Sequence, residues 1–128
     1  MTSVVICIGT IGSPTFDRCK SSVLQLNKSN RYTKDLSIVK DFSPQCAWLN
    51  EMRVRSAHFD WCLQVDEDMY LKPHALDRLL AEAEMLTKKG HKILNVSSFL
   101  HDIFLCEKIG SLKLWSSKAL SSLEFRDT

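Results

Sequence analysis

No run of apolar residues in this chain approaches the about 18 that a membrane-spanning helix needs, so the sequence predicts no transmembrane segment. The five cysteines include no Cys-x-x-Cys pair, which argues against a zinc site or a disulfide scaffold. Scattered thiols are typical of a reducing compartment, and we expect a cytoplasmic protein. Lysine and arginine are also scattered and the net charge is only +2, so no nucleic-acid partner is expected.

The composition is that of an ordinary globular domain. The chain has 128 residues, of which 45% are apolar and 25% are charged, and these fractions are close to the average for folded proteins. This length is enough for one hydrophobic core. No internal repeat or low-complexity segment divides it, so we expect a single domain over residues 1–128.

Strand-like and helix-like segments alternate along the chain. Short apolar runs predict strands at residues 4–8, 36–39, 61–65 and 92–96. Apolar stripes at helical spacing predict helices at residues 16–27, 43–57 and 73–89. The pattern then weakens, with a strand or irregular segment at 99–106, a short strand at 113–116 and a helical turn at 118–123. The alternation predicts a three-layer α/β/α fold in which helices cover both faces of a mostly parallel sheet.

The apolar stripes also predict the core. The helix at 73–89 should pack on the strand at 61–65; the residues concerned are Leu76, Leu79, Leu80 and Ala83 on the helix and Leu63 and Val65 on the strand. Trp48, Leu49 and Met52 should face the core from the preceding helix. Cys7 and Cys62 lie inside apolar strands, where we expect them to be small buried side chains.

Three consecutive acids, Asp66-Glu67-Asp68, follow the apolar run at 61–65. In an extended chain Asp66 and Asp68 project to one side and Glu67 to the other. Adjacent carboxylates repel one another, and a hard divalent cation such as Mg²⁺ or Mn²⁺ offsets that repulsion. The carboxyl end of a strand is also where open α/β sheets bind ligands. The alternative is a solvated turn, because aspartate is common in turns for its own hydrogen-bonding reasons.

The block Phe59–Leu76 resembles the D-x-D region of family 2-like glycosyltransferases with the GT-A fold. There, an aromatic-led strand ends in an acidic triplet and a proline opens the next helix. Residues 3–10 resemble the first strand of that family's nucleotide-binding half, and residues 19–25 resemble the helix after it. The resemblance implies a metal-dependent glycosyltransferase that uses a nucleotide-diphosphate sugar and an unknown acceptor. It also implies that Asp68 binds Mn²⁺ or Mg²⁺, and that Asp66 binds the metal through water or holds the ribose.

Four further residues are candidates for the donor site. Thr10 lies where the family's first loop touches the nucleotide, and Asp41 ends the second strand, where the family often places an acid against the base. The surrounding segment departs from the family's D-x-x-S-x-D pattern. Arg18 and Arg53 could meet the phosphates, although a solvated helix face is the alternative for both.

The C-terminal part of the chain shows little resemblance to the family's acceptor-binding half. Family members are usually longer, and their catalytic base lies downstream; Asp127 is the candidate for that base here. We therefore expect a donor-binding core whose acceptor site a partner chain could complete. One alternative is a nucleotidyltransferase, but residues 9–13 have its glycines without a nearby lysine or arginine before Arg18. The other is a non-catalytic module that binds nucleotide diphosphate or a partner.

Overall fold

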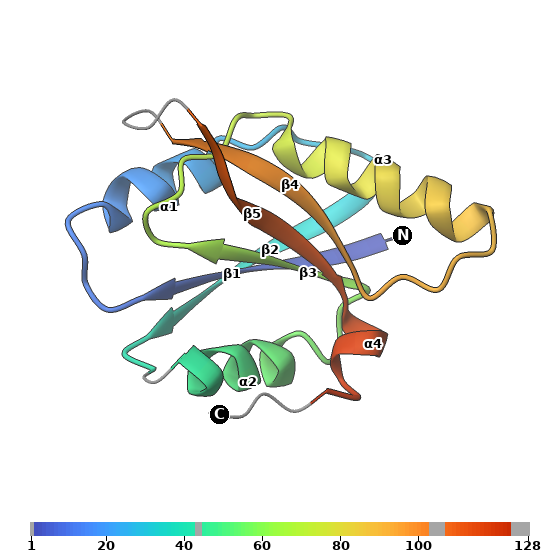
Figure 1. The fold of residues 1–128 in the computed structure, drawn as a ribbon, viewed down its shortest axis with the longest axis horizontal. Helices are drawn as coiled ribbons and strands as arrows, with labels where there is room; N and C mark the ends of the chain where they lie inside the picture. Colours follow the sequence, from blue (N-terminus) through green and yellow to red (C-terminus); the bar gives the residue numbers. More distant parts are fainter. Residues whose placement is uncertain (1, 43–44, 103–106, 124–128) are drawn as a thin grey trace.

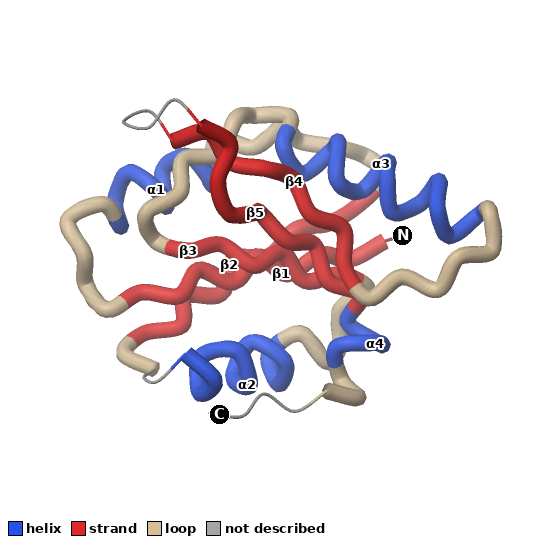
Figure 2. Tube along the Cα trace, viewed as in Figure 1, coloured by secondary structure: helices blue, strands red, loops and turns tan. Residues whose placement is uncertain are grey.

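The computed structural model describes residues 2–42, 45–102 and 107–123, which form one sheet with helices on both faces (Figures 1 and 2). The strands are β1 (Thr2–Thr10), β2 (Tyr32–Lys40), β3 (Trp61–Asp66), β4 (Asn95–Asp102) and β5 (Glu107–Ser116). The helices are α1 (Phe16–Leu24), α2 (Gln45–Arg55), α3 (Ala75–Lys88) and α4 (Ser117–Leu120). The chain is therefore an α/β domain, as the alternating pattern predicts.

The sheet is mixed, with the strand order β2-β1-β3-β5-β4. The strand β1 pairs in parallel with β2 and with β3, whereas β5 is antiparallel to both β3 and β4. The prediction of a mostly parallel sheet thus holds for the first three strands and is wrong for the last two. Parallel neighbours need a long crossover connection, and the four positions between Asp102 and Glu107 leave no room for one.

Two apolar clusters fill the space on either side of the sheet. Helices α1 and α3 cover one face, and α2 and α4 cover the other (Figure 1). Side chains alternate along a strand, so Val4, Ile6 and Ile8 of β1 join the α1–α3 cluster, and Val5 and Cys7 join the α2–α4 cluster.

Both predicted packing arrangements are confirmed. The α3 stripe and its partners on β3 lie in one cluster, namely Leu76, Leu79, Leu80, Ala83, Leu63 and Val65. Trp48 and Met52 of α2 are buried in the other cluster with Cys7 and Cys62, and Leu49 packs against it.

The ends of the helices have local causes. Gly90 follows α3 with a φ of 87°, the left-handed conformation in which glycine ends helices. Helix α1 ends at Leu24, three residues earlier than predicted. The Lys34 ammonium group donates hydrogen bonds to the carbonyl oxygens of Leu26 and Asn27 at 2.9 and 2.7 Å, which places a cation just past the helix C-terminus. The predicted start of α2 at residues 43 and 44 lies outside the described residues.

Candidate functional site

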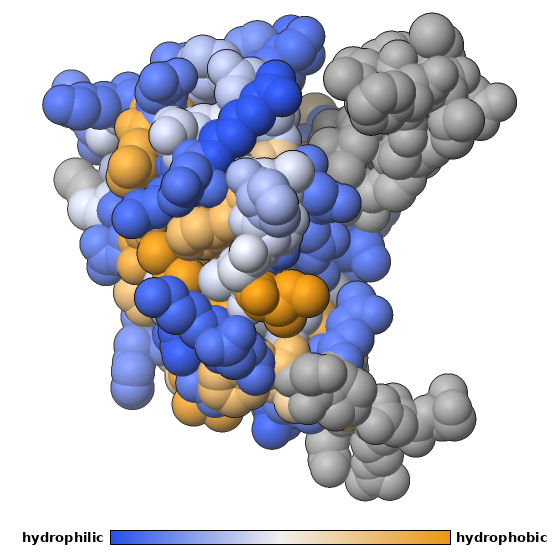
Figure 3. Space-filling view, turned by 90° about the vertical axis from the view of Figure 1, so that its left-hand side faces the viewer, coloured by the Kyte–Doolittle hydropathy of each residue, from blue (hydrophilic) through white to orange (hydrophobic). Residues whose placement is uncertain are grey.

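A cavity of about 470 Å³ lies at the carboxyl edge of the parallel strands, on the side of the molecule that faces the viewer in Figure 3. Parallel pairing sets Gly9 of β1 beside Asp66 of β3, so the segments that follow these two strands meet at this edge. Hydrophobic side chains lie in the middle of the face and hydrophilic ones surround them (Figure 3). The cavity has an acidic wall, an apolar wall and a backbone wall formed by the loop after β1.

The acidic wall comes from the triplet that follows β3, with Asp66, Glu67 and Asp68 all lining the cavity. Burial raises the pKa of Asp66 above its ordinary value, and the nearby Asp68 carboxylate raises it further. The Lys113 ammonium group opposes this shift. Lys113 lies on β5 directly opposite Gln64 of β3. Asp66 is two residues beyond Gln64, so the strand alternation puts its side chain on the same face of the sheet as Lys113.

The middle acid, Glu67, binds the loop that follows β1. Its Oε2 accepts a hydrogen bond from the Ile11 amide at 2.8 Å, and its Oε1 accepts one from the Ser13 amide at 3.0 Å. Burial alone would raise the pKa of Glu67, but hydrogen bonds from the Thr10 hydroxyl and from these two amides outweigh it and lower the pKa below its ordinary value. Glu67 is therefore tied to the loop and is not a free turn residue.

The apolar wall consists of Val39, Phe42 and the indole ring of Trp48. Trp48 is 8% exposed and lies against the backbone of Gly9. A Cβ atom on Gly9 would lie 2.5 Å from Cε2 of that ring, closer than two such atoms can approach. The close neighbour of the Gly9 backbone is therefore Trp48.

The structure brings three of the predicted site residues together at the cavity. Thr10, Asp66 and Asp68 all line the cavity. Asp41 follows β2 directly and is exposed, with a positive φ of 59°, and it is not among the described residues that line the cavity. The Asp41 amide donates to the carbonyl oxygen of Thr10 at 2.9 Å, and the contact of its side chain with a base stays a prediction.

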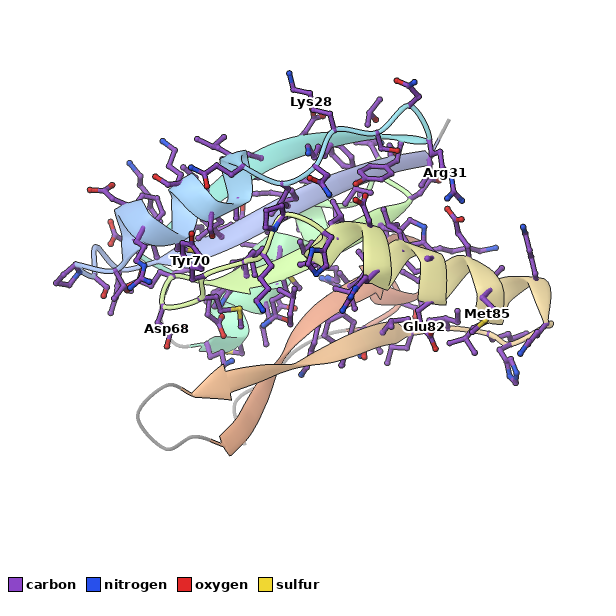
Figure 4. The ribbon with its side chains drawn as sticks, turned by 90° about the horizontal axis from the view of Figure 1, so that it is seen from above. Lys28, Arg31, Asp68, Tyr70, Glu82 and Met85 are labelled. Carbon is purple, nitrogen blue, oxygen red and sulfur yellow. The ribbon has the colours of Figure 1, made fainter. Side chains whose placement is uncertain are left out.

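Both candidate arginines have partners within the protein. The Arg18 guanidinium lies 4.9 Å from the centre of the Tyr70 ring, a distance at which a cation is attracted to an aromatic face. Figure 4 shows Tyr70 next to α1 and Asp68 on the other side of the segment that follows β3. Arg53 donates a hydrogen bond from Nη1 to the carbonyl oxygen of Leu123. Asp127, the candidate base, lies outside the described residues.

Of the described carboxylates that line the cavity, Glu67 binds loop amides, which leaves Asp66 and Asp68 as the candidates for a metal ion. Across the described residues, no group of three or more histidine, cysteine, aspartate or glutamate side chains is arranged to hold a metal. Asp66 and Asp68 nevertheless lie close enough for the charge of one to raise the pKa of the other. Mg²⁺ in enzymes is commonly bound by one or two carboxylates, with substrate phosphates and water completing its shell. The acidic wall fits that type of site.

No protein-family model matches this chain, and no curated protein sequence matches it. Within the described part of the chain, no helix combines the length and the apolarity needed to cross a membrane.

Proposed function

We propose that this chain is a GT-A-type donor-binding domain, which binds a nucleotide-diphosphate sugar with Mn²⁺ or Mg²⁺ and transfers the glycosyl group to an acceptor. One observation carries the proposal. A cavity at the carboxyl edge of a sheet has paired carboxylates, Asp66 and Asp68, on one wall and the apolar side chains of Phe42 and Trp48 on another. Its volume of about 470 Å³ falls within the ~300–1,000 Å³ usual for small-molecule sites.

The two walls suit the two ends of such a ligand. Asp68 and Asp66 would hold the metal ion, which when bound stabilises the negative charge that develops on the departing diphosphate. The base and ribose would lie against the apolar wall, where an aromatic face offers stacking and apolar area. Thr10 lines the cavity between these walls, since it is buried at the end of β1, the strand between β2 and β3.

The occupied loop argues against the nucleotidyltransferase alternative. Such an enzyme would need the loop after β1 to bind phosphate through its backbone amides and a basic side chain. Here the amides of Ile11 and Ser13 already donate to Glu67. A phosphate at that position would have to displace a tethered carboxylate while lying beside Asp66 and Asp68.

The test is calorimetric titration of the chain with a panel of nucleoside diphosphates, with and without Mn²⁺. Metal-dependent binding of a uridine or guanosine diphosphate is expected, and Asp68→Asn should abolish it without unfolding the protein. Asp35→Asn is the matched control, because it removes the same charge from an exposed position on β2. Equal binding with and without metal, in both the wild type and Asp68→Asn, would remove the proposal.

Turnover separates an enzyme from a non-catalytic binding module. A metal ion held by Asp66 and Asp68 would stabilise the leaving group whatever the nucleophile, and Asp68 is exposed to water. Slow, Mn²⁺-dependent hydrolysis of the nucleotide sugar is therefore expected, and the Asp68→Asn variant should lack it. Tight metal-dependent binding with no hydrolysis above the buffer rate would favour the binding module.

A further inference from the structure

The three acids that follow β3 have different surroundings. β3 ends at Asp66, and beyond that point Glu67 reaches across to the loop after β1. Its two oxygens accept separate backbone hydrogen bonds, from Ile11 at 2.8 Å and from Ser13 at 3.0 Å. Asp66 and Asp68, by contrast, line the acidic wall, where the Asp68 carboxylate raises the pKa of Asp66.

The hydrogen bonds to Glu67 hold a segment that has few other constraints. Ile11 is 75% exposed, and Gly12 has a φ of 86° with nothing within 4 Å of the place a Cβ would take. The Gly12 amide donates to the Thr10 hydroxyl oxygen at 3.0 Å. Hydrogen bonds to a charged acceptor are roughly twice as strong as neutral ones. The carboxylate of Glu67 is thus a common anchor for Ile11 and Ser13.

We propose that Glu67 is a positioning residue and not a metal ligand: its carboxylate holds residues 10–13 in place as the backbone wall of the cavity. Both of its oxygens are engaged by loop amides, so metal binding falls to Asp66 and Asp68 alone. The consequence for the donor ligand rests on the proposed function: loosening this loop should weaken nucleotide binding while leaving the affinity for the metal by itself unchanged. The anchoring itself is a property of the free protein.

Glu67→Ala is the variant that tests this role, with Glu67→Gln as a milder second variant that keeps the shape and one acceptor oxygen. The first measurement is hydrogen exchange of the Ile11 and Ser13 amides by NMR, without metal or nucleotide. Exchange should be about tenfold or more faster in Glu67→Ala, given the strength of a charge-assisted hydrogen bond. Sodium formate at tens of millimolar should slow it again by supplying the missing carboxylate, whereas sodium chloride at equal ionic strength should not.

The second measurement is Mn²⁺ alone, followed by paramagnetic broadening of amide signals near the triplet. The apparent affinity should stay within about twofold of the wild type in Glu67→Ala and Glu67→Gln, and Asp68→Asn should lose it, since the variant replaces a charged carboxylate ligand by a neutral amide. Wild-type exchange at Ile11 and Ser13 in both Glu67 variants, or faster exchange that formate does not reverse, would overturn the anchoring role. A loss of Mn²⁺ affinity equal to that in Asp68→Asn would make Glu67 a ligand and overturn the division of the triplet.

These outcomes are separate from the fate of the donor proposal. If amide exchange in the loop increases as expected but no nucleoside diphosphate binds, Glu67 still anchors the cavity wall, and the cavity binds a different ligand. If nucleotide binds but the loop exchange is unchanged, the donor proposal stands and the positioning role is lost.

Discussion

The backbone of Gly9 lies against the indole ring of Trp48 at the cavity. Placing a methyl group on Gly9 puts it 2.5 Å from Cε2 of Trp48 and 2.9 Å from two further ring atoms. Because the ring is packed in the α2–α4 cluster, it has little room to move away. Gly9→Ala should therefore lower the free energy of unfolding by about 1–3 kcal/mol, the usual cost of overpacking, as measured by urea denaturation.

A second background separates this clash from any general intolerance of the position. In Trp48→Leu the ring atoms are gone, so Gly9→Ala should cost clearly less there. Gly12→Ala is the matched control: it meets no atom within 4 Å but has a φ of 86°, so its cost should be the same in both backgrounds. An equal cost of Gly9→Ala with and without the indole ring would rule out the clash.

Ionisation of Asp66 is unfavourable in the folded protein, and a bound metal ion would offset that free energy. Its pKa is raised in the folded protein by burial and by Asp68, so the folded state binds this proton more tightly than the unfolded chain does. A raised pKa means that stability is present at low pH and is lost as the pH rises through the titration of Asp66. Above that range the ionised carboxylate therefore destabilises the metal-free fold.

Asp66→Asn should accordingly raise the unfolding free energy at pH 7 in chelator-treated buffer. The gain should shrink as the pH falls, and vanish below the ordinary carboxyl pKa of 3.8, where the wild-type group is protonated in both states. Urea denaturation across a pH series measures this, with Asp35→Asn as a control for simple loss of charge. A gain that stayed constant down to acid pH would point to a cause other than ionisation.

At the scale of the elements, the structure confirms the predicted packing of α3 on β3. Leu79 is 4% exposed and belongs to the α1–α3 cluster with Leu63 and Val65. Leu79→Ala should cost about 2–5 kcal/mol, the range for emptying a packed core site. Glu82→Ala is the control on the same helix, since Glu82 is exposed (Figure 4) and should change stability by less than about 0.5 kcal/mol. Denaturant midpoints of the two variants give the comparison.

The elements that were predicted well have signals that lie within a short stretch of sequence. The apolar stripe of α3 and the glycine at position 90 are local, and so are the β-branched run of β1 and the apolar run of β3. The predicted lengths of some strands and helices differ from those in the structure. β2 spans Tyr32–Lys40 where only residues 36–39 were expected, because its first half is polar and β1 supplies its hydrogen bonds.

The hairpin of β4 and β5 was not predicted, and the reason is physical. A strand's sequence reports the burial of its two faces, but not the direction of the neighbour to which it hydrogen-bonds. The strand expected at 92–96 begins instead at Asn95, and the short strand expected at 113–116 is the end of β5, which starts at Glu107. Their antiparallel pairing follows from a short connection that carries no strong turn signal.

The candidate site was predictable where it depends on strand ends. Thr10, Asp66 and Asp68 meet because β1 and β3 are parallel neighbours. The direction of Glu67 was missed, since strand alternation stops at Asp66, where β3 ends. The apolar wall was missed for a different reason: Phe42 and Trp48 reach the cavity from a loop and a helix, and no local pattern shows that a core-facing tryptophan also borders a cavity.

At the scale of the whole molecule, the cavity depends on both halves of the core. Its acidic wall follows β3, whose Leu63 and Val65 belong to the α1–α3 cluster. Its apolar wall includes Val39 and Trp48, which belong to the α2–α4 cluster. A ligand that touches both walls therefore binds only the assembled fold, and by mass action it must stabilise that fold as a unit.

Thermal unfolding should show this linkage. We expect one cooperative transition for the free chain, as for most small single domains. A nucleoside diphosphate with Mn²⁺ at about 100 times its dissociation constant should add about 2.7 kcal/mol of stability and move the whole transition upward. Nucleotide without metal should leave the midpoint unchanged, and a chelator should reverse the shift. Asp68→Asn should lose the shift and Asp35→Asn should keep it. An upward shift of the same size with nucleotide and chelator would mean that the ligand is held without the acidic wall, and the aromatic side of the cavity would then be the part to mutate.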